Sequence, residues 1–193
     1  MSSEVEICRM ALDLIGDYAL SDLAEGSKQA RLRRRNFAPM RDAVLRAHPW
    51  NCALTRTTLP KDAAAPAFGF ARQYTLPADC LRLLPLTRDG AFGGAPVAHR
   101  IEGRRLLTDA AAPLPVVYVR RVADTAVFDA ALVQAIAARL AWQIAYNLTG
   151  SRTKQAELGQ VYREILKEAR RIDGMEGTPE PQTASAWLIA RDA

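Results

Sequence analysis

Apolar residues recur at spacings of three and four along four stretches of this chain, and that spacing predicts helices with one buried face. The first row consists of Val5, Cys8, Leu12 and Ile15. Ser3-x-x-Glu6 is a capping-box pattern at its start, and Gly16 is a typical helix stop at its end. We therefore expect the first helix over residues 3–15.

A long second helix is predicted to open at Gly26-Ser27 and to end at His48-Pro49-Trp50, because a residue before proline avoids the helical region. Its buried side is marked by Ala30, Phe37, Met40, Val44 and Leu45. Pro39 lies inside this stretch. It should kink or divide the helix, since proline removes one backbone donor and clashes with the preceding turn.

The third helical stretch is apolar on more than one side. Large apolar residues recur there every four positions, with many alanines between them: Phe128, Leu132, Ile136, Leu140 and Ile144. A helix that is apolar nearly all round is normally buried on all sides. Residues 126–148 therefore predict either a central bundle position or a subunit interface. Ser151 then caps a fourth helix, whose apolar side continues to Ile172.

Between residues 55 and 121 the pattern changes to short extended pieces. Residues 55–70 are rich in Thr, Pro and Ala and predict a loop or a ragged strand. Strands are predicted at residues 74–77, 81–86, 97–102, 105–108 and 115–120. Gly103 separates two of them and predicts a tight hairpin. We interpret the segment as a small antiparallel β insertion.

The helical pattern ends after Asp173. A linker without core residues follows, containing Gly174, Gly177, Pro179 and Pro181. The expected fold is therefore mainly α. It comprises a bundle of about four helices from residues 1–54 and 122–173, a β-rich insertion at 55–121, and an extended C-terminal tail at 174–193.

The tip of this tail carries the apolar triplet Trp187-Leu188-Ile189, followed closely by Arg191. The tip either folds back on its own bundle or docks on a partner. Tryptophan in a pocket is a typical interface anchor, which favours docking. We take Trp187, Leu188, Ile189 and Arg191 as candidate partner-binding residues.

The composition suits one domain, or one domain with an appendage. The chain has 193 residues, of which 49% are hydrophobic and 24% charged, so it can bury a core of ordinary size. No apolar run approaches the roughly 20 residues that span a bilayer, and the first residues show no signal-peptide pattern. We expect a protein that starts in a cytoplasm and has no membrane partner.

The net charge of +5 is partly local, because Arg31, Arg33, Arg34 and Arg35 form one run. Such a run is either a solvated helix face or a contact to phosphate or to an acidic protein rim. DNA binding by these arginines is therefore an alternative function. No RNA-binding or zinc-finger signature accompanies the run, and few aromatic residues interleave with it.

Patterns of catalytic chemistry are missing from the sequence. His48 and His99 have no local partner motif for acid–base catalysis, and no GxSxG, GxGxxG or GxxxxGK[ST] occurs. Cys8, Cys52 and Cys80 are widely spaced and predict buried free thiols, because structural zinc usually needs four closely paired ligands. We expect no enzyme and no metal site.

Several segments, taken in their order along the chain, carry a resemblance. Arg41-Asp42-Ala43-Val44-Leu45-Arg46-Ala47-His48-Pro49-Trp50-Asn51 is similar to an RDxxLRxHPWNFA stretch, with Cys52 where phenylalanine is more usual, and residues 74–82 are similar to a YxLPxDCLR stretch. Residues 101–108 and 117–122 resemble a hairpin and a closing strand, and residues 128–129 and 140–151 resemble a third helix. Together they resemble the head-to-tail adaptors of podoviruses, the tail tubular protein A family, over most of residues 4–172.

The resemblance implies a structural function. Such proteins form a ring, usually of twelve copies, below the portal of a tailed phage. The ring joins the DNA-filled head to the tail nozzle and lines the path by which the genome leaves. The resemblance also implies a helical bundle with a β extension, no cofactor, and a C-terminal segment that reaches the portal.

For this chain the expected partners are further copies of itself, the portal protein and the tail nozzle protein, with genomic DNA passing through the channel. The expected location is the neck of the virion, and the host cytoplasm during assembly. Two alternatives stay open. One is a DNA-binding helical protein that uses the arginine run, and the other is a connector of a different virion or gene-transfer particle.

Overall fold

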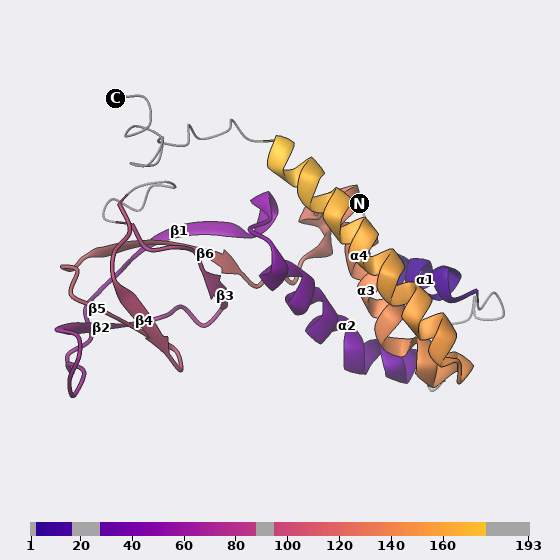
Figure 1. The fold of residues 1–193 in the computed structure, drawn as a ribbon, viewed down its shortest axis with the longest axis horizontal. Coiled ribbons are helices and arrows are strands. Elements are labelled where there is room, and N and C mark those ends of the chain that lie inside the picture. Colours follow the sequence, from indigo (N-terminus) through magenta and orange to yellow (C-terminus); the bar gives the residue numbers. More distant parts are fainter. Residues whose placement is uncertain (1–2, 17–27, 88–94, 177–193) are drawn as a thin grey trace, which may run out of the picture. The chain divides into compact units, whose positions relative to one another are not determined.

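The structure is a computed structural model, and it describes residues 3–16, 28–87 and 95–176. The chain divides into two compact units (Figure 1). The described parts of residues 1–53 and 120–176 form the helical unit, and those of residues 54–119 form the β unit. Each unit buries apolar side chains of its own.

The first helix of the helical unit, α1, spans Glu4–Ile15, and both of its predicted ends are confirmed. Ser3 Oγ accepts a hydrogen bond from the Glu6 backbone N–H at 3.2 Å, and the Glu6 carboxylate accepts one from Ser3 N at 2.6 Å. These bonds hold the pKa of Glu6 below its usual value. Gly16 ends the helix with a φ of 85°, a conformation that glycine adopts without steric penalty.

The second helix, α2, spans Lys28–Ala47 and runs through Pro39 as one element. Of the two outcomes predicted for this proline, a kink or a division, the division is therefore wrong. Pro39 is exposed, whereas Phe37, Val44 and Leu45 are buried on both sides of it along the chain. Packing of these three side chains holds the two halves in one helix. The short helical turn η2, Asn51–Ala53, follows Pro49.

The third helix, α3, spans Ala130–Thr149 and starts later than predicted. The turn η3, Thr125–Val127, is capped by Asp124, and Phe128 after it is extended, so that Asp129 becomes the N-cap of α3. Helices α1, α2 and α4 all pack on α3. The central bundle position predicted for this apolar helix is therefore confirmed within the helical unit.

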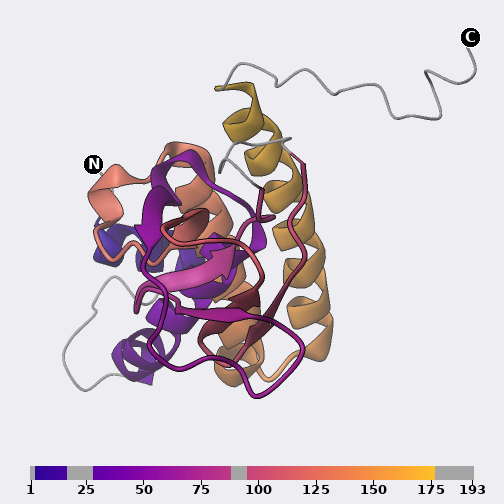
Figure 2. The ribbon, with the colours of Figure 1, turned by 90° about the vertical axis from the view of Figure 1, so that its left-hand side faces the viewer.

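The fourth helix, α4, spans Arg152–Met175, and Figure 2 shows it as one uninterrupted element. Gly150 ends α3 in the left-handed region at a φ of 68°. Ser151 then caps α4, as predicted, and its Oγ accepts from Lys154 N at 3.1 Å. Among the described residues, no helix combines the length and the apolar character needed to cross a membrane.

The β unit contains two three-stranded antiparallel sheets. The first has the order β1-β6-β3, from Leu54–Leu59, Leu114–Arg120 and Cys80–Leu83. The second has the order β2-β5-β4, from Arg72–Thr75, Arg105–Thr108 and His99–Glu102. The predicted hairpin is the β4–β5 pair, in which Glu102 faces Arg105. Gly103, at a φ of 59°, takes the first place of its two-residue turn, which is where a type II′ turn needs glycine.

Apolar side chains from both sheets share one core. It consists of Leu59, Tyr74, Leu76, Leu86, Leu106, Leu114, Val116 and Tyr118. The two tyrosine hydroxyls find partners at its edge: Tyr74 Oη donates to the Ala110 carbonyl at 2.7 Å, and Tyr118 Oη donates to Asp79 at 3.2 Å. Pairing satisfies the polar end of each buried ring.

The expectation of a mainly α fold is wrong, because the protein is a mixed α/β fold. About half of the described residues lie in helices and about a fifth in strands. The misjudged element is β1, in a segment that we predicted as a loop or a ragged strand. It pairs along its whole length with β6, from Leu54 opposite Val119 to Leu59 opposite Leu114. A strand that forms by pairing with a distant strand need not have the amino-acid composition typical of strands.

Candidate interaction surfaces

The end of α2 and the end of α4 are joined by a polar cluster, which we call the Asp173 anchor: His48, Asn51 and Asp173. His48 Nε2 lies 3.0 Å from Asp173 Oδ2, and Asn51 N donates to Asp173 Oδ1 at 3.0 Å. Asn51 Nδ2 also donates to the Asp173 carbonyl at 2.9 Å. These bonds fix the segment after α2 against the last turns of α4.

The position of Asp173 depends on those partners. A carboxylate near the C-terminal end of a helix is opposed by the helix dipole, and burial of a charge is unfavourable unless it is hydrogen-bonded. Asp173 is only 5% exposed, and His48 and the Asn51 N–H supply its bonds. Because α4 ends at Met175, the anchor holds the helix end that precedes residues 177–193.

Trp50 packs beside the anchor and is fully buried. Its Nε1–H donates to the Val44 carbonyl at 2.9 Å, and its ring meets the His48 ring edge-on, with the ring centroids 4.8 Å apart. Aromatic pairs favour such an edge-to-face arrangement. The His48-Pro49-Trp50-Asn51 sequence therefore contributes a core residue and two polar contacts to the helical unit.

A second polar chain begins at Asp42 on α2. Its Oδ1 accepts from Arg41 Nη2 at 2.8 Å, and its Oδ2 accepts from Arg121 Nε at 2.7 Å. On α4, Arg170 Nη2 donates to the Ala47 carbonyl at 3.0 Å. Residues 41–51, which carry much of the family resemblance, thus tie α2 to α4 and to the segment after β6.

An apolar groove opens on the helical unit, with α3 contributing alongside α1 and α4. Its volume is about 410 Å³, and its lining is Met10, Asp13, Leu14, Gln134, Ala137 and Ile165. Met10, Leu14 and Ile165 are half-buried, whereas Asp13 and Gln134 are exposed. The groove therefore combines apolar walls with one carboxylate, a composition typical of sites that hold an apolar side chain.

Elsewhere on α3 and α4 lies an arginine–aromatic cluster: Arg139, Trp142 and Tyr162. The Trp142 and Tyr162 rings are stacked with centroids 5.8 Å apart, and the Arg139 guanidinium lies 4.4 Å from the Trp142 centroid. Gly159 leaves room for the indole, since a Cβ there would lie 3.0 Å from Trp142 Nε1. Arginine, tryptophan and tyrosine are the residues enriched at protein-binding hot spots.

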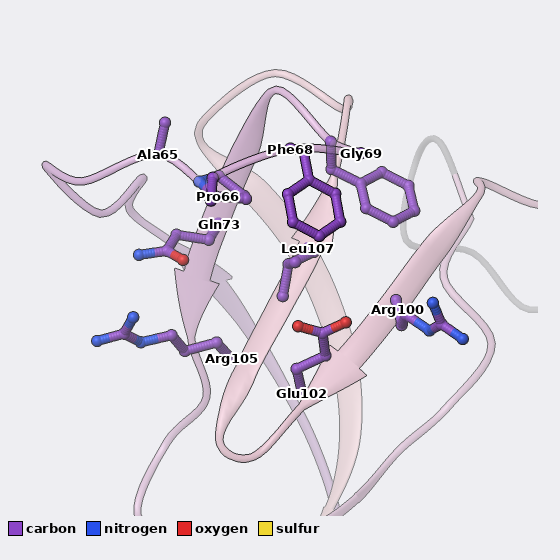
Figure 3. Close-up of a pocket in the computed structure, with 11 residues that line it drawn as sticks. Ala65, Pro66, Phe68, Gly69, Gln73, Arg100, Glu102, Arg105 and Leu107 are labelled. Carbon is purple, nitrogen blue, oxygen red and sulfur yellow. The ribbon is translucent and has the colours of Figure 1, made fainter.

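The β unit carries a pocket of about 400 Å³. Figure 3 shows Phe68 and Leu107 above the Glu102 carboxylate, while the guanidinium groups of Arg100 and Arg105 point to opposite sides. Phe68 is 87% exposed. A single exposed aromatic residue is common on protein surfaces, so this pocket does not by itself indicate a ligand.

All three cysteines lie in the described residues, and none of them forms a disulfide. Cys8 is buried, and Cys52 and Cys80 are half-buried. Burial raises the pKa of Cys52 to about 11, with further contributions from the charges of Asp129 and Asp173. Within residues 3–16, 28–87 and 95–176, no group of three or more potential metal ligands is placed to hold an ion.

The structure describes the arginine run that was predicted to bind a partner, but the predicted tail residues lie outside the described part of the chain. Arg31, Arg34 and Arg35 are exposed on α2, at spacings that place them on one helix face. Arg33 lies in the same helix, but its side chain is outside the described part of the structure. Trp187, Leu188, Ile189 and Arg191 lie outside the described residues, so their role stays a prediction.

The sequence analysis missed the Asp173 anchor and the arginine–aromatic cluster. A signal for Asp173 was present, because it extends the buried row of α4, which consists of Leu158, Tyr162, Leu166, Ala169 and Asp173. A charged residue on the apolar face of a helix indicates a buried partner. The cluster gave no such signal, since Arg139 and Trp142 meet Tyr162 only through the packing of two helices.

Comparison with known protein families finds no family model that matches this chain, and comparison with curated protein sequences finds no match.

Proposed function

We propose that this chain is the subunit of a head-to-tail adaptor ring in a tailed phage. The ring, of about twelve copies as the family resemblance implies, would join the portal to the tail nozzle and line the DNA exit channel. The protein would then belong to the neck of the virion, after assembly in the host cytoplasm. It would act by holding partners in place, without catalysis and without a cofactor.

The observation that carries the proposal is the structural role of residues 41–51. They lie in the part of the chain, residues 41–151, where the resemblance to the adaptor family is best. Arg41 and Asp42 form the polar chain to Arg121, Trp50 is fully buried, and Asn51 binds Asp173. Several of the residues that carry the resemblance therefore help to hold the helical unit together.

A ring needs a head-to-tail contact between two different surfaces of the same protein. The arginine–aromatic cluster supports one such surface. Arg139 and Trp142 are half-buried, and Tyr146 and Arg152 nearby are exposed, so part of this area is accessible to a neighbouring copy. The alanine-rich side of α3 is buried inside its own unit, so only the side of α3 that carries Trp142 and Tyr146 is open to such a contact.

The tail is the proposed portal contact. Trp187, Leu188 and Ile189 supply apolar anchors, and Arg191 adds a charge, after a linker that contains three of the chain's glycine and proline residues, Gly177, Pro179 and Pro181. The anchor at Asp173 gives this linker a fixed starting point on α4. Such an arrangement suits a segment that must reach a partner while the body of the protein stays in the ring.

Electron microscopy of the purified chain mixed with the portal protein of the same genome tests the proposal. We expect rings seated on one face of the portal, and no rings of the chain alone, because weak repeated contacts favour assembly on a template. Deletion of residues 178–193 should abolish portal binding and leave the circular dichroism spectrum of the folded units unchanged. Normal portal binding by the truncated chain would contradict the role of the tail, and no binding by the full chain would contradict the adaptor itself.

DNA binding is a second candidate function, favoured by the exposed face of Arg31, Arg34 and Arg35 on α2. Fluorescence anisotropy with duplex DNA over a series of salt concentrations tests it. A DNA-binding protein should show affinity that falls steeply with salt and a shallower slope after Arg33, Arg34 and Arg35 are neutralised. Weak binding with no change in slope would leave these arginines as a solvated helix face.

A further inference from the structure

The apolar groove on the helical unit lacks an assigned occupant, and the tail contains an apolar segment of matching chemistry. We propose that, in the free protein, the Trp187–Arg191 segment docks into the groove of its own chain. The inference rests on the proposed function in one respect, because the same segment is the proposed portal contact. The groove would be a second binding site for that segment, in competition with the portal.

The shape and chemistry of the groove fit this occupant. About 410 Å³ of space is bounded by Met10 and Leu14 from α1 and by Ile165 from α4. Methionine and aliphatic walls adapt to a flat aromatic side chain. Covering half-buried apolar walls with Trp187 and Leu188 removes apolar surface of both partners from water, and that removal drives the association.

Charge supports the same pairing. Asp13 is the acidic group that lines the groove, and it is exposed at the rim. Arg191 is the cationic residue nearest the apolar triplet in the tail. With the triplet in the groove, Arg191 can reach a carboxylate at the rim. Exposed pairs of this kind contribute little affinity, so the pair orients the segment more than it holds it.

The length of the connecting chain also fits. Ile165 lies eleven residues before Glu176 on α4, which is about 16 Å along the axis at 1.5 Å per residue. Another eleven residues join Glu176 to Trp187. A flexible chain of that length has a root-mean-square reach of about 18 Å. Effective concentration is greatest when reach and span agree, so even a weak groove would be occupied within one chain.

Docking within the chain would cover the apolar tip until a partner with higher affinity takes it. The portal would then bind a segment that has to leave the groove first. This competition would lower the apparent affinity for the portal, because part of the binding free energy is spent on leaving the groove.

The test uses the full chain labelled with 5-fluorotryptophan, which places one fluorine on each of Trp50, Trp142 and Trp187. Fluorine NMR gives one resonance for each, and loss of one signal in Trp187→Phe assigns it. We expect a soluble paramagnetic agent to broaden the Trp187 resonance little in the native chain. The shielding should persist on dilution, because the contact lies within one chain.

Substitutions in the groove should remove that shielding. Leu14→Glu and Met10→Glu each place a charge on an apolar wall, and in either variant Trp187 should become as accessible as in a peptide of residues 183–193. Val127→Glu is the matched control, since Val127 is an exposed apolar residue of the same unit outside the groove. The control should keep the native shielding, and circular dichroism should show all three variants folded.

A charge exchange sharpens the result. Asp13→Arg should reduce the shielding at most about fivefold, as expected for one exposed ion pair, and adding Arg191→Asp should restore it. An exposed Trp187 in the native chain would overturn the inference, as would equal shielding in the groove variants and the control. Shielding that disappears on dilution, together with dimers in sedimentation, would place the segment in the groove of a second copy and also overturn it. Portal binding is measured separately, so the adaptor proposal survives or fails on its own.

Discussion

The two units of the molecule reach their folds by different means. In the helical unit, each of α1, α3 and α4 begins at a side chain that caps it: Ser3, Asp129 and Ser151. In the β unit, β1 pairs with β6, which lies at the far end of the same segment. Local signals therefore specify much of the first unit, whereas pairing between distant residues specifies the second.

The units also differ in how they treat buried polar groups. The helical unit buries an ionisable group, Asp173, and ties it to two partners from another element. The β unit buries neutral groups with neighbours within the unit: Thr108 Oγ1 donates to the Ala98 carbonyl at 2.8 Å, and Tyr74 Oη donates to Ala110. Loss of a partner should therefore be more disruptive in the helical unit, because an unpaired buried charge is costlier than an unpaired hydroxyl.

Truncation of one core side chain in each unit should have the largest effect on stability, and the effect should be confined to that unit. Trp50→Ala removes a fully buried ring and its bond to Val44, and should destabilise the helical unit by about 3–5 kcal/mol. Leu106→Ala should destabilise the β unit by about 2–5 kcal/mol. Hydrogen–deuterium exchange should show lost protection chiefly in the unit that carries each substitution. Equal loss in both units after either substitution would mean that they unfold as one body.

The Asp173 anchor offers a smaller and more specific change. Asp173→Ala removes the bonds to His48 Nε2 and to Asn51 N, and should reduce the free energy of unfolding by about 1.5–3 kcal/mol, as for hydrogen bonds to a charged group. Glu168→Ala is the matched control, since this exposed carboxylate on the same helix pairs with Arg171 at the surface. Urea unfolding should separate the two variants, and equal midpoints would show that the anchor contributes nothing.

The reactivity of Cys52 tests how well the helical unit excludes water. Its pKa is raised from 9.0 to about 11, so at neutral pH the reactive thiolate should be up to about a hundredfold rarer than in the unfolded chain. Above pH 9 the unfolded chain loses this proton first, and stability should therefore fall as pH rises from 9 to 11. Iodoacetamide labelling read by mass spectrometry measures the rate, and equal rates in native and urea-unfolded protein would contradict the raised pKa.

The same contrast explains how much of the fold could be predicted. Helix ends at Ser3, Gly16 and Ser151 were predictable because each cap bonds to residues within four positions. The hairpin at Gly103 was predictable for the same reason, since its turn is local. The order β1-β6-β3 was not, because strand alternation does not state which strand is the partner.

Prediction of the candidate surfaces was limited in the same way. The arginine run and the tail stand out in composition. The apolar groove depends on residues from three helices, and Met10, Ala137 and Ile165 look like ordinary core positions until the helices are placed. The sequence analysis placed Asp173 at a domain boundary and did not use its position in the buried row of α4, although Asp173 binds the segment after α2.

The smallest expected effects come from two glycines, and they should have opposite signs in the two units. Gly103 adopts a φ of 59° in the β hairpin, so Gly103→Ala should destabilise the β unit by about 1–2 kcal/mol, although no atom lies within 4 Å of the added methyl group. Gly174 lies in α4 with equally open space around it, and Gly174→Ala should stabilise the helical unit by up to about 1 kcal/mol. Both variants add one methyl group, so their difference isolates backbone conformation. Neither added methyl group has an atom within 4 Å, so side-chain packing should contribute little to either shift. Thermal unfolding shifts of the same sign in the two variants would contradict that reasoning.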